Sequence, residues 1–223
     1  MIITLDGPCG SGKSTLAQLL AQKLGFFYIN SGYLYRSLAY ILIDEFGYDE
    51  AQLHNPNLDD IAFILHENNF IYQYRDGVAQ VFFRGNEITQ HLKMSTVSHH
   101  ASIISAHQGV RQLIVPVQQK FAESYSLVTD GRDCGTEIYP QAEFKFYVTA
   151  APEIRAQRLQ ADLQTKGIEM SFDEVLQMTI SRDDRDMMRE VSPLKKAADA
   201  IEIDTSNLSV HQLLEFILTI VQK

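Results

Sequence analysis

The residues best suited to chemistry lie near the start of the chain, in the run Gly7-Pro8-Cys9-Gly10-Ser11-Gly12-Lys13-Ser14-Thr15. Its spacing matches GxxxxGK[ST], a loop whose backbone N–H groups surround phosphate oxygens while the lysine reaches the terminal phosphates. An apolar run, Ile2 to Leu5, precedes the loop and a helical pattern follows it, so a new helix would add its positive end to the same anion site. We expect Lys13 to act as a catalytic cation and Ser14 to ligate Mg²⁺. The alternative is a glycine-rich turn between a strand and a helix, with an exposed lysine.

A second polar run, Asp130-Gly131-Arg132-Asp133, directly follows the apolar stretch from Ser126 to Thr129. An acid at the end of such a strand is where phosphate-loop enzymes keep the carboxylate that orders Mg²⁺ or its waters. A polar turn is the alternative, but two acids, an arginine and two glycines within residues 130 to 135 exceed what a turn needs. We therefore expect Asp130 to hold Mg²⁺ through water.

Three further segments carry side chains suited to anions. Ser31, Tyr35 and Arg36 follow the second apolar run, at the sheet edge where ligands of open α/β folds bind. Arg155 and Arg158 lie three residues apart behind Pro152, at an expected helix start. A helical stripe at positions i, i+3, i+4 and i+7 comprises Arg182, Arg185, Asp186 and Arg189. Such a stripe is usually a solvated face, but a neighbouring anion site favours phosphate binding.

Composition narrows the class of protein. The chain has 223 residues, 45% of them hydrophobic, which suits a single domain over residues 1–223 with one core. A net charge of −9 argues against nucleic-acid binding, because it would repel a polyphosphate backbone. No apolar run is long enough to span a membrane, and the loop begins by residue 7, so we expect no signal peptide. Two cysteines, Cys9 and Cys134, suit a reducing cytoplasm, and a monomer is expected.

The apolar pattern predicts an α/β fold with a parallel five-stranded sheet flanked by helices. Continuous apolar runs, which are typical of strands buried on both faces, occur at Ile2 to Leu5, Phe26 to Ile29, Leu127 to Thr129, Phe144 to Val148 and Ala200 to Ile203. Capping boxes at Ser171/Glu174 and Ser209/Gln212 predict two helix starts. Residues 69–89 differ: Asp76-Gly77 between two alternating runs predicts a β-hairpin with a third short strand, inserted as a small subdomain.

Taken together, these residues resemble the bacterial cytidylate kinases, which are nucleoside monophosphate kinases with a P-loop NTPase fold. The resemblance spans the whole chain. It rests on residues 7 to 15, on Ser31-Gly32 with Tyr35-Arg36, on residues 130 to 136, and on residues 182 to 189. It implies a γ-phosphoryl transfer from ATP to CMP and dCMP, giving CDP and ADP, with Mg²⁺ as cofactor. It also implies that residues 69–89 enlarge the monophosphate-binding region and that residues 152–168 form a helical lid.

The resemblance also assigns individual roles. ATP would be held by Gly7, Pro8, Cys9, Gly10, Ser11, Gly12, Lys13, Ser14 and Thr15. CMP would be held by Ser31, Tyr35, Arg36, Ser102, Arg111, Arg132, Asp133, Arg182, Asp186 and Arg189. Of these, Ser31, Arg36 and Arg132 would meet the phosphate, and Ser102, Arg111 and Asp133 would face the cytosine. Arg182 and Asp186 would hold the ribose. Besides Lys13, the catalytic cations would be Arg132, Arg155, Arg158 and Arg182, with Arg155 and Arg158 carried by the lid.

Three departures from the family pattern stand out. Asn30 occupies a position that is commonly aspartate, Met187-Met188 replace expected polar residues, and Arg158-Leu159 replaces the consecutive arginines of some relatives. None removes a group that phosphoryl transfer requires. Two other functions stay open: a kinase for another small acceptor, such as UMP or shikimate, and an ATP-binding regulatory switch. A GTPase switch would carry an Asn-Lys-x-Asp motif, which the chain lacks.

Overall fold

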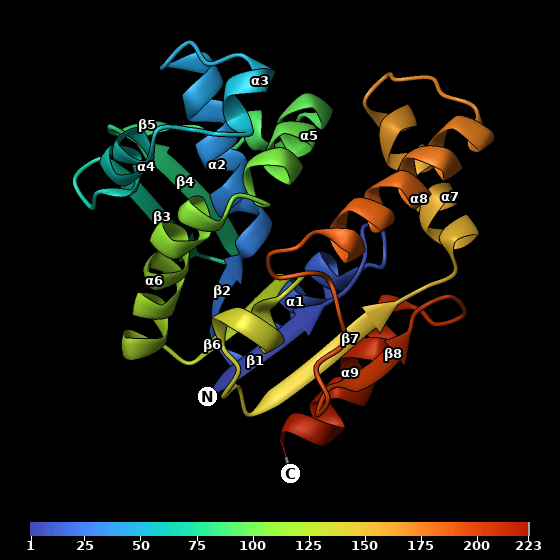
Figure 1. The fold of residues 1–223 in the computed structure, drawn as a ribbon. Coiled ribbons are helices and arrows are strands. Elements are labelled where there is room, and N and C mark those ends of the chain that lie inside the picture. The colour runs from blue at the N-terminus through green and yellow to red at the C-terminus, as the bar shows by residue number, and fades with distance from the viewer. Residues whose placement is uncertain (223) are drawn as a thin grey trace.

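Five strands form one parallel sheet in a computed structural model that describes residues 1–222 (Figure 1). The strands are β1 (Ile2–Asp6), β2 (Phe27–Asn30), β6 (Leu127–Gly131), β7 (Phe144–Thr149) and β8 (Ile201–Asp204). They pair in the order β2-β6-β1-β7-β8, and every pairing is parallel. This confirms the predicted P-loop α/β class. Because β1 and β6 lie side by side, the residues that follow them meet at one edge of the sheet.

The helices α1 (Lys13–Leu24) and α9 (Val210–Val221) pack against each other, and α1 also contacts β6. The helix α2 (Ser31–Asp44), which directly follows β2, packs against α5 (Ser95–Ile104). The remaining helices of this part are α3 (Glu50–Leu53), α4 (Leu58–Leu65) and α6 (Gln108–Ser124). Leu5, Leu20 and Leu38 are among the fully buried side chains that join sheet and helices in one core.

A small antiparallel sheet, as predicted for residues 69–89, contains β3 (Phe70–Arg75), β4 (Val78–Phe83) and β5 (Asn86–Glu87). The sheet is tied to the core of the molecule at two points. The hydroxyl of Tyr72 accepts from the backbone N–H of Asn30 at 2.9 Å. At the hairpin tip, Gln18 of α1 donates to the carbonyl oxygen of Gly77 at 2.6 Å. The hairpin is therefore anchored on both β2 and the helix that follows the phosphate loop.

The helices α7 (Pro152–Thr165) and α8 (Phe172–Met188) form a hairpin beyond the end of β7 (Figure 1). The hairpin has an apolar cluster of its own, centred on Ala156, Leu163 and Val175. The capping box of Ser171 and Glu174 that starts α8 is present, as is the box that starts α9. The α7 helix covers most of the predicted lid, residues 152–168, whose movement stays a prediction. No helix within residues 1–222 is both long enough and apolar enough to cross a membrane.

Candidate active site

The phosphate loop joins β1 to α1, and its residues line an open cavity that we call the donor cavity. The loop residues in its wall are Cys9, Gly10, Gly12, Lys13, Ser14 and Thr15, whereas Gly7, Pro8 and Ser11 lie outside it. A side chain at Gly7 would collide with the carbonyl oxygen of Val148, so the loop can pass β7 only with glycine there. Lys13 is buried, and its ammonium group donates to the carbonyl oxygen of Pro8 at 2.9 Å.

Ser14 and Asp130 meet at the floor of the donor cavity. The hydroxyl of Ser14 donates to one carboxylate oxygen of Asp130 at 2.6 Å, and the hydroxyl of Tyr28 donates to the other at 2.6 Å. The amide of Asn30 in turn donates to the Tyr28 hydroxyl at 3.1 Å. Mg²⁺ prefers hard oxygen ligands and is usually held by one or two carboxylates together with substrate phosphates and water. A serine hydroxyl and one carboxylate beside a phosphate loop fit that ion.

Four cations stand in the wall of the donor cavity: Lys13, Arg36, Arg132 and Arg182. Burial, followed by the charge of Arg132, lowers the pKa of Lys13 to about 7. Burial and then the charge of Arg182 lower the pKa of Arg36. Within residues 1–222, no carboxylate lies within ion-pair distance of Arg36 or Arg182. An anion bound here would relieve the repulsion between these charges.

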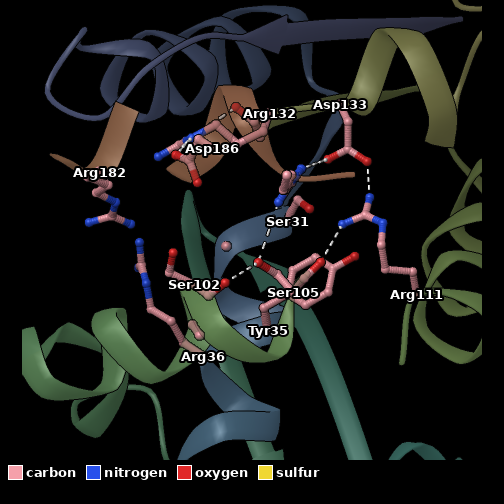
Figure 2. A pocket seen from close by; sticks show the side chains of 14 residues that line it. Ser31, Tyr35, Arg36, Ser102, Ser105, Arg111, Arg132, Asp133, Arg182 and Asp186 are labelled. Carbon is pink, nitrogen blue, oxygen red and sulfur yellow. Dashed lines mark hydrogen bonds and ion pairs between the residues drawn. The ribbon is translucent and has the colours of Figure 1, made fainter. Parts of the chain in front are cut away.

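A second cavity, which we call the acceptor cavity, lies beside the donor cavity. Its wall includes all ten side chains that the family resemblance assigns to CMP: Ser31, Tyr35, Arg36, Ser102, Arg111, Arg132, Asp133, Arg182, Asp186 and Arg189. They come from α2, α5, α6, α8 with its C-cap residue Arg189, and the segment after β6. Figure 2 shows the labelled residues among them converging on one space. The structure thus brings together residues that lie as far apart in the sequence as Ser31 and Arg189.

Ion pairs organise the wall of the acceptor cavity. The guanidinium of Arg111 donates to Asp133, and Arg189 lies 3.5 Å from the other oxygen of that carboxylate. Burial raises the pKa of Asp133, while the charges of Arg111 and Arg189 oppose that rise. Nε of Arg132 donates to Asp186 at 2.7 Å. Burial disfavours the ionised form of Asp186, but the charge and hydrogen bond of Arg132, together with the charges of Arg182 and Arg189, outweigh burial and hold the pKa of Asp186 below its usual value.

The two cavities adjoin each other and share part of their walls. Gly32, Arg36, Gly131, Arg132 and Arg182 stand in the walls of both. In Figure 2 the guanidinium groups of Arg36 and Arg182 point toward each other across this boundary. Two anions bound in the two cavities would therefore meet between the same arginines.

Comparison with known proteins agrees with this arrangement. The family model described as "Cytidylate kinase" matches residues 3–223. The chain belongs to the cytidylate kinase family. A cytidylate kinase from Fervidobacterium nodosum is 37% identical over 99% of this chain and 96% of its own length. One from Clostridium tetani is 36% identical over 100% of this chain and 94% of its own length.

A solved structure shares the fold of this chain. The structure of an uncharacterised protein from Eubacterium ventriosum aligns over 100% of this chain and 98% of its own, with a TM-score of 0.54 and 16% identity. At that identity the likeness concerns the fold alone. The membership of this chain in a family of phosphotransferases therefore rests on the family model and on the relatives at 36% and 37% identity.

Arg155 and Arg158, which the family pattern places in the lid, lie outside both cavities. Arg155 is buried, donates to the carbonyl oxygen of Cys9 at 3.2 Å and pairs with Asp183 at 2.7 Å. Arg158 donates to the carbonyl and hydroxyl oxygens of Thr205, at 2.7 and 2.9 Å. Both side chains brace the outer side of the phosphate loop in this structure. Their catalytic role stays a prediction.

The departures from the cytidylate kinase pattern have definite places in the structure. Asn30 caps α2 by accepting from the N–H of Tyr33, and it also lines the donor cavity. Met187 and Met188 are exposed at the end of α8, away from both cavities. Arg185, the fourth member of the α8 stripe, is exposed as well and contributes to neither wall. The part of the stripe that lines the acceptor cavity is therefore Arg182, Asp186 and Arg189.

Sequence reasoning missed several residues at the site. Ser105 lines the acceptor cavity, and its carbonyl oxygen accepts from Arg111 at 3.1 Å. Tyr28 holds Asp130, and Asp6 accepts two hydrogen bonds from the turn after Asp133. The sequence offered two signals for these residues. Tyr28 is a polar side chain inside an apolar strand run, and Asp6 is an acid directly before the phosphate loop.

Proposed function

We propose that this cytidylate kinase family member transfers the γ-phosphoryl group of ATP to CMP and dCMP, giving CDP or dCDP and ADP. The observation that carries the proposal is the set of arginines that the two adjoining cavities share. Arg36, Arg132 and Arg182 belong to both walls, so a phosphate chain in one cavity and a monophosphate in the other would share these cations. A phosphoryl transfer between two phosphates would use such shared cations, because charge develops between the two groups in the transition state.

In the donor cavity, the loop N–H groups and Lys13 would hold the ATP phosphates. The hydroxyl of Ser14 would bind Mg²⁺ directly, and Asp130, oriented by Tyr28, would hold its waters. When bound, Mg²⁺ neutralises charge on the β and γ phosphates.

In the acceptor cavity, Asp133 and Ser102 would face the cytosine, with Arg111 holding the Asp133 carboxylate. An ionised carboxylate can accept from the exocyclic amino group of cytosine, whereas uracil presents a carbonyl oxygen at that position. Asp186 and Arg182 would hold the ribose. Ser31, Arg36 and Arg132 would bind the monophosphate at the boundary of the cavities.

During transfer, a phosphate oxygen of CMP attacks the γ-phosphorus in line, and the bond from that phosphorus to the β-bridging oxygen breaks as ADP leaves. The enzyme's contribution is to position both nucleotides and to place cations around the transferred group. Lys13, Arg132 and Arg182 are suitably placed for this role. Closure of residues 152–168 would exclude water, which otherwise competes with CMP for the phosphoryl group.

The test is ADP production by the purified protein in the presence of Mg²⁺, with CMP, dCMP, UMP, shikimate or no acceptor. We expect turnover with CMP and dCMP, much slower turnover with UMP, and none with shikimate or without acceptor. Chelation of Mg²⁺ by EDTA should abolish turnover and excess Mg²⁺ should restore it. Preferred use of UMP or shikimate would overturn the choice of acceptor. ADP production that does not depend on any acceptor would instead indicate a nucleotide switch.

A further inference from the structure

Asp6 is a buried acid at the carboxyl end of β1 that neither cavity wall includes. Its two carboxylate oxygens accept from the backbone N–H groups of Cys134, at 2.9 Å, and Gly135, at 2.7 Å. These partners lie more than a hundred residues away in the sequence. A single carboxylate thus joins the last residue before the phosphate loop to the first residues of a turn beside the acceptor cavity.

That turn is a short π-helical segment, Cys134–Ile138, and Asp133 stands at its N-cap position. An N-cap aspartate ordinarily turns its side chain back to accept from the first free N–H groups of its own helix. Asp133 makes no such bond. The N–H of Gly135, which it would otherwise accept, is already bonded to Asp6.

The Asp133 carboxylate points instead toward the acceptor cavity, where Arg111 donates to it (Figure 2). We propose that Asp6 is a positioning residue for acceptor selectivity: by capping the 134–138 turn in place of Asp133, it keeps the Asp133 carboxylate directed at the base. This inference rests on the proposed function, in which Asp133 contacts cytosine.

The residues around Asp6 allow the 134–138 turn to approach its carboxylate closely. A Cβ added to Gly135 would lie 2.7 Å from the hydroxyl oxygen of Thr4 and 3.4 Å from the Asp6 carboxylate, so the bond needs glycine at 135. Burial, and further the charge of Asp133, raise the pKa of Asp6 to about 6, which leaves Asp6 ionised at neutral pH. Two buried carboxylates held near each other oppose folding, which favours a functional reason for Asp6 over a structural one.

Asp6→Asn tests the inference, because an amide can accept only one of the two N–H groups and presents its own N–H₂ to the other. We expect the ratio of kcat/KM for CMP to that for UMP to fall at least about fivefold, through KM for CMP, while KM for ATP changes less than about twofold. Thr4→Val is the matched control. Thr4 lies two residues earlier on β1, is fully buried and has no hydrogen-bond partner for its hydroxyl within residues 1–222. Thr4→Val should leave the CMP-to-UMP ratio of kcat/KM within about twofold of the wild-type value.

The same variant made in an Asp133→Ala background separates the two proposals. If Asp6 acts through Asp133, then Asp6→Asn should not lower the CMP-to-UMP ratio further in that background. An unchanged ratio in Asp6→Asn, together with a narrowed ratio in Asp133→Ala, would overturn the role of Asp6 alone. An unchanged ratio in Asp133→Ala would overturn the base contact and, with it, this role for Asp6. Asp6→Glu, which keeps the charge but displaces the carboxylate, should also lower the CMP-to-UMP ratio of kcat/KM. This variant replaces Asp6→Asn if Asp6→Asn does not fold.

Discussion

The donor and acceptor cavities are built in opposite ways. One contiguous loop contributes residues 9, 10 and 12–15 to the donor cavity, and the donor-cavity cations Lys13 and Arg36 have lowered pKa values. The acceptor cavity is assembled from several helices, and apart from Arg36 and Arg182, which it shares with the donor cavity, its charged side chains are paired, as in Arg132 with Asp186. The donor cavity therefore holds unsatisfied positive charge, whereas the acceptor cavity holds side chains already oriented by partners. We expect a change in the first to affect rate and a change in the second to affect selectivity.

Lys13→Ala should give the largest effect. Removal of one charge aimed at transition-state oxygens typically costs on the order of 3 kcal/mol, so we expect kcat to fall at least about a hundredfold in a folded protein. Lys23→Ala, at an exposed position in the last turn of the same helix, is the control and should stay within about twofold of wild type. A coupled ADP assay measures both variants. Near-normal turnover by Lys13→Ala would contradict the assignment of the donor cavity.

Asp133→Ala should change selectivity more than rate. The loss of one well-placed contact to the cytosine amino group is worth about 1 to 3 kcal/mol, or roughly 5- to 150-fold in the CMP-to-UMP ratio of kcat/KM. Glu137→Ala removes an exposed acid from the same turn and should leave the ratio unchanged. If Asp133 merely pairs with Arg111, Asp133→Ala should lower kcat/KM for CMP and for UMP by the same factor. An equal fall for both nucleotides would count against recognition of the base by Asp133.

The difference between the cavities also sets what the sequence could predict. The donor loop is a local motif, and the apolar runs around it predicted all five strands of the sheet within a few residues. Helical spacing singled out Arg182, Asp186 and Arg189 of the acceptor cavity, whereas Ser102 and Arg111 were named through the family resemblance alone. The roles of Tyr28 and Asp6 were missed because the carboxylate of Asp130 and the N–H groups of Cys134 and Gly135 lie 102 or more residues away, and the register of parallel strands brings these groups together.

Asp6→Asn should also change the pH dependence of stability. The pKa of Asp6 rises from an unfolded value near 4 to about 6 in the folded protein, so its contribution to stability is present below pH 4 and is lost as the pH rises through 6. The wild type should therefore lose about 2 kcal/mol relative to Asp6→Asn between pH 4 and pH 7.5. Urea unfolding of both proteins at several pH values measures this difference. A difference that does not vary with pH would mean that Asp6 is not held in a costly charged state.

The smallest expected effect compares two cysteines, one at each cavity. Cys9 lines the donor cavity; burial raises its pKa, but the charges of Arg182, Arg132, Lys13 and Arg36 outweigh burial and lower it to about 7. Cys134, in the turn beside the acceptor cavity, is fully buried, and burial and the charge of Asp6 raise its pKa well above the usual value.

Because the thiolate is the reactive form, alkylation of Cys9 by iodoacetamide should increase roughly tenfold from pH 6 to pH 8 and then level off. An unperturbed thiol would still be gaining reactivity above pH 8. Bound ATP with Mg²⁺ should slow the reaction at Cys9, since the phosphates would cover the loop and neutralise the cations that lower its pKa. Cys134 should react only after unfolding, which mass spectrometry of the alkylated peptides can resolve. Equal labelling of the two cysteines, or labelling of Cys9 that ATP does not slow, would contradict the proposed electrostatic difference between the two cavities.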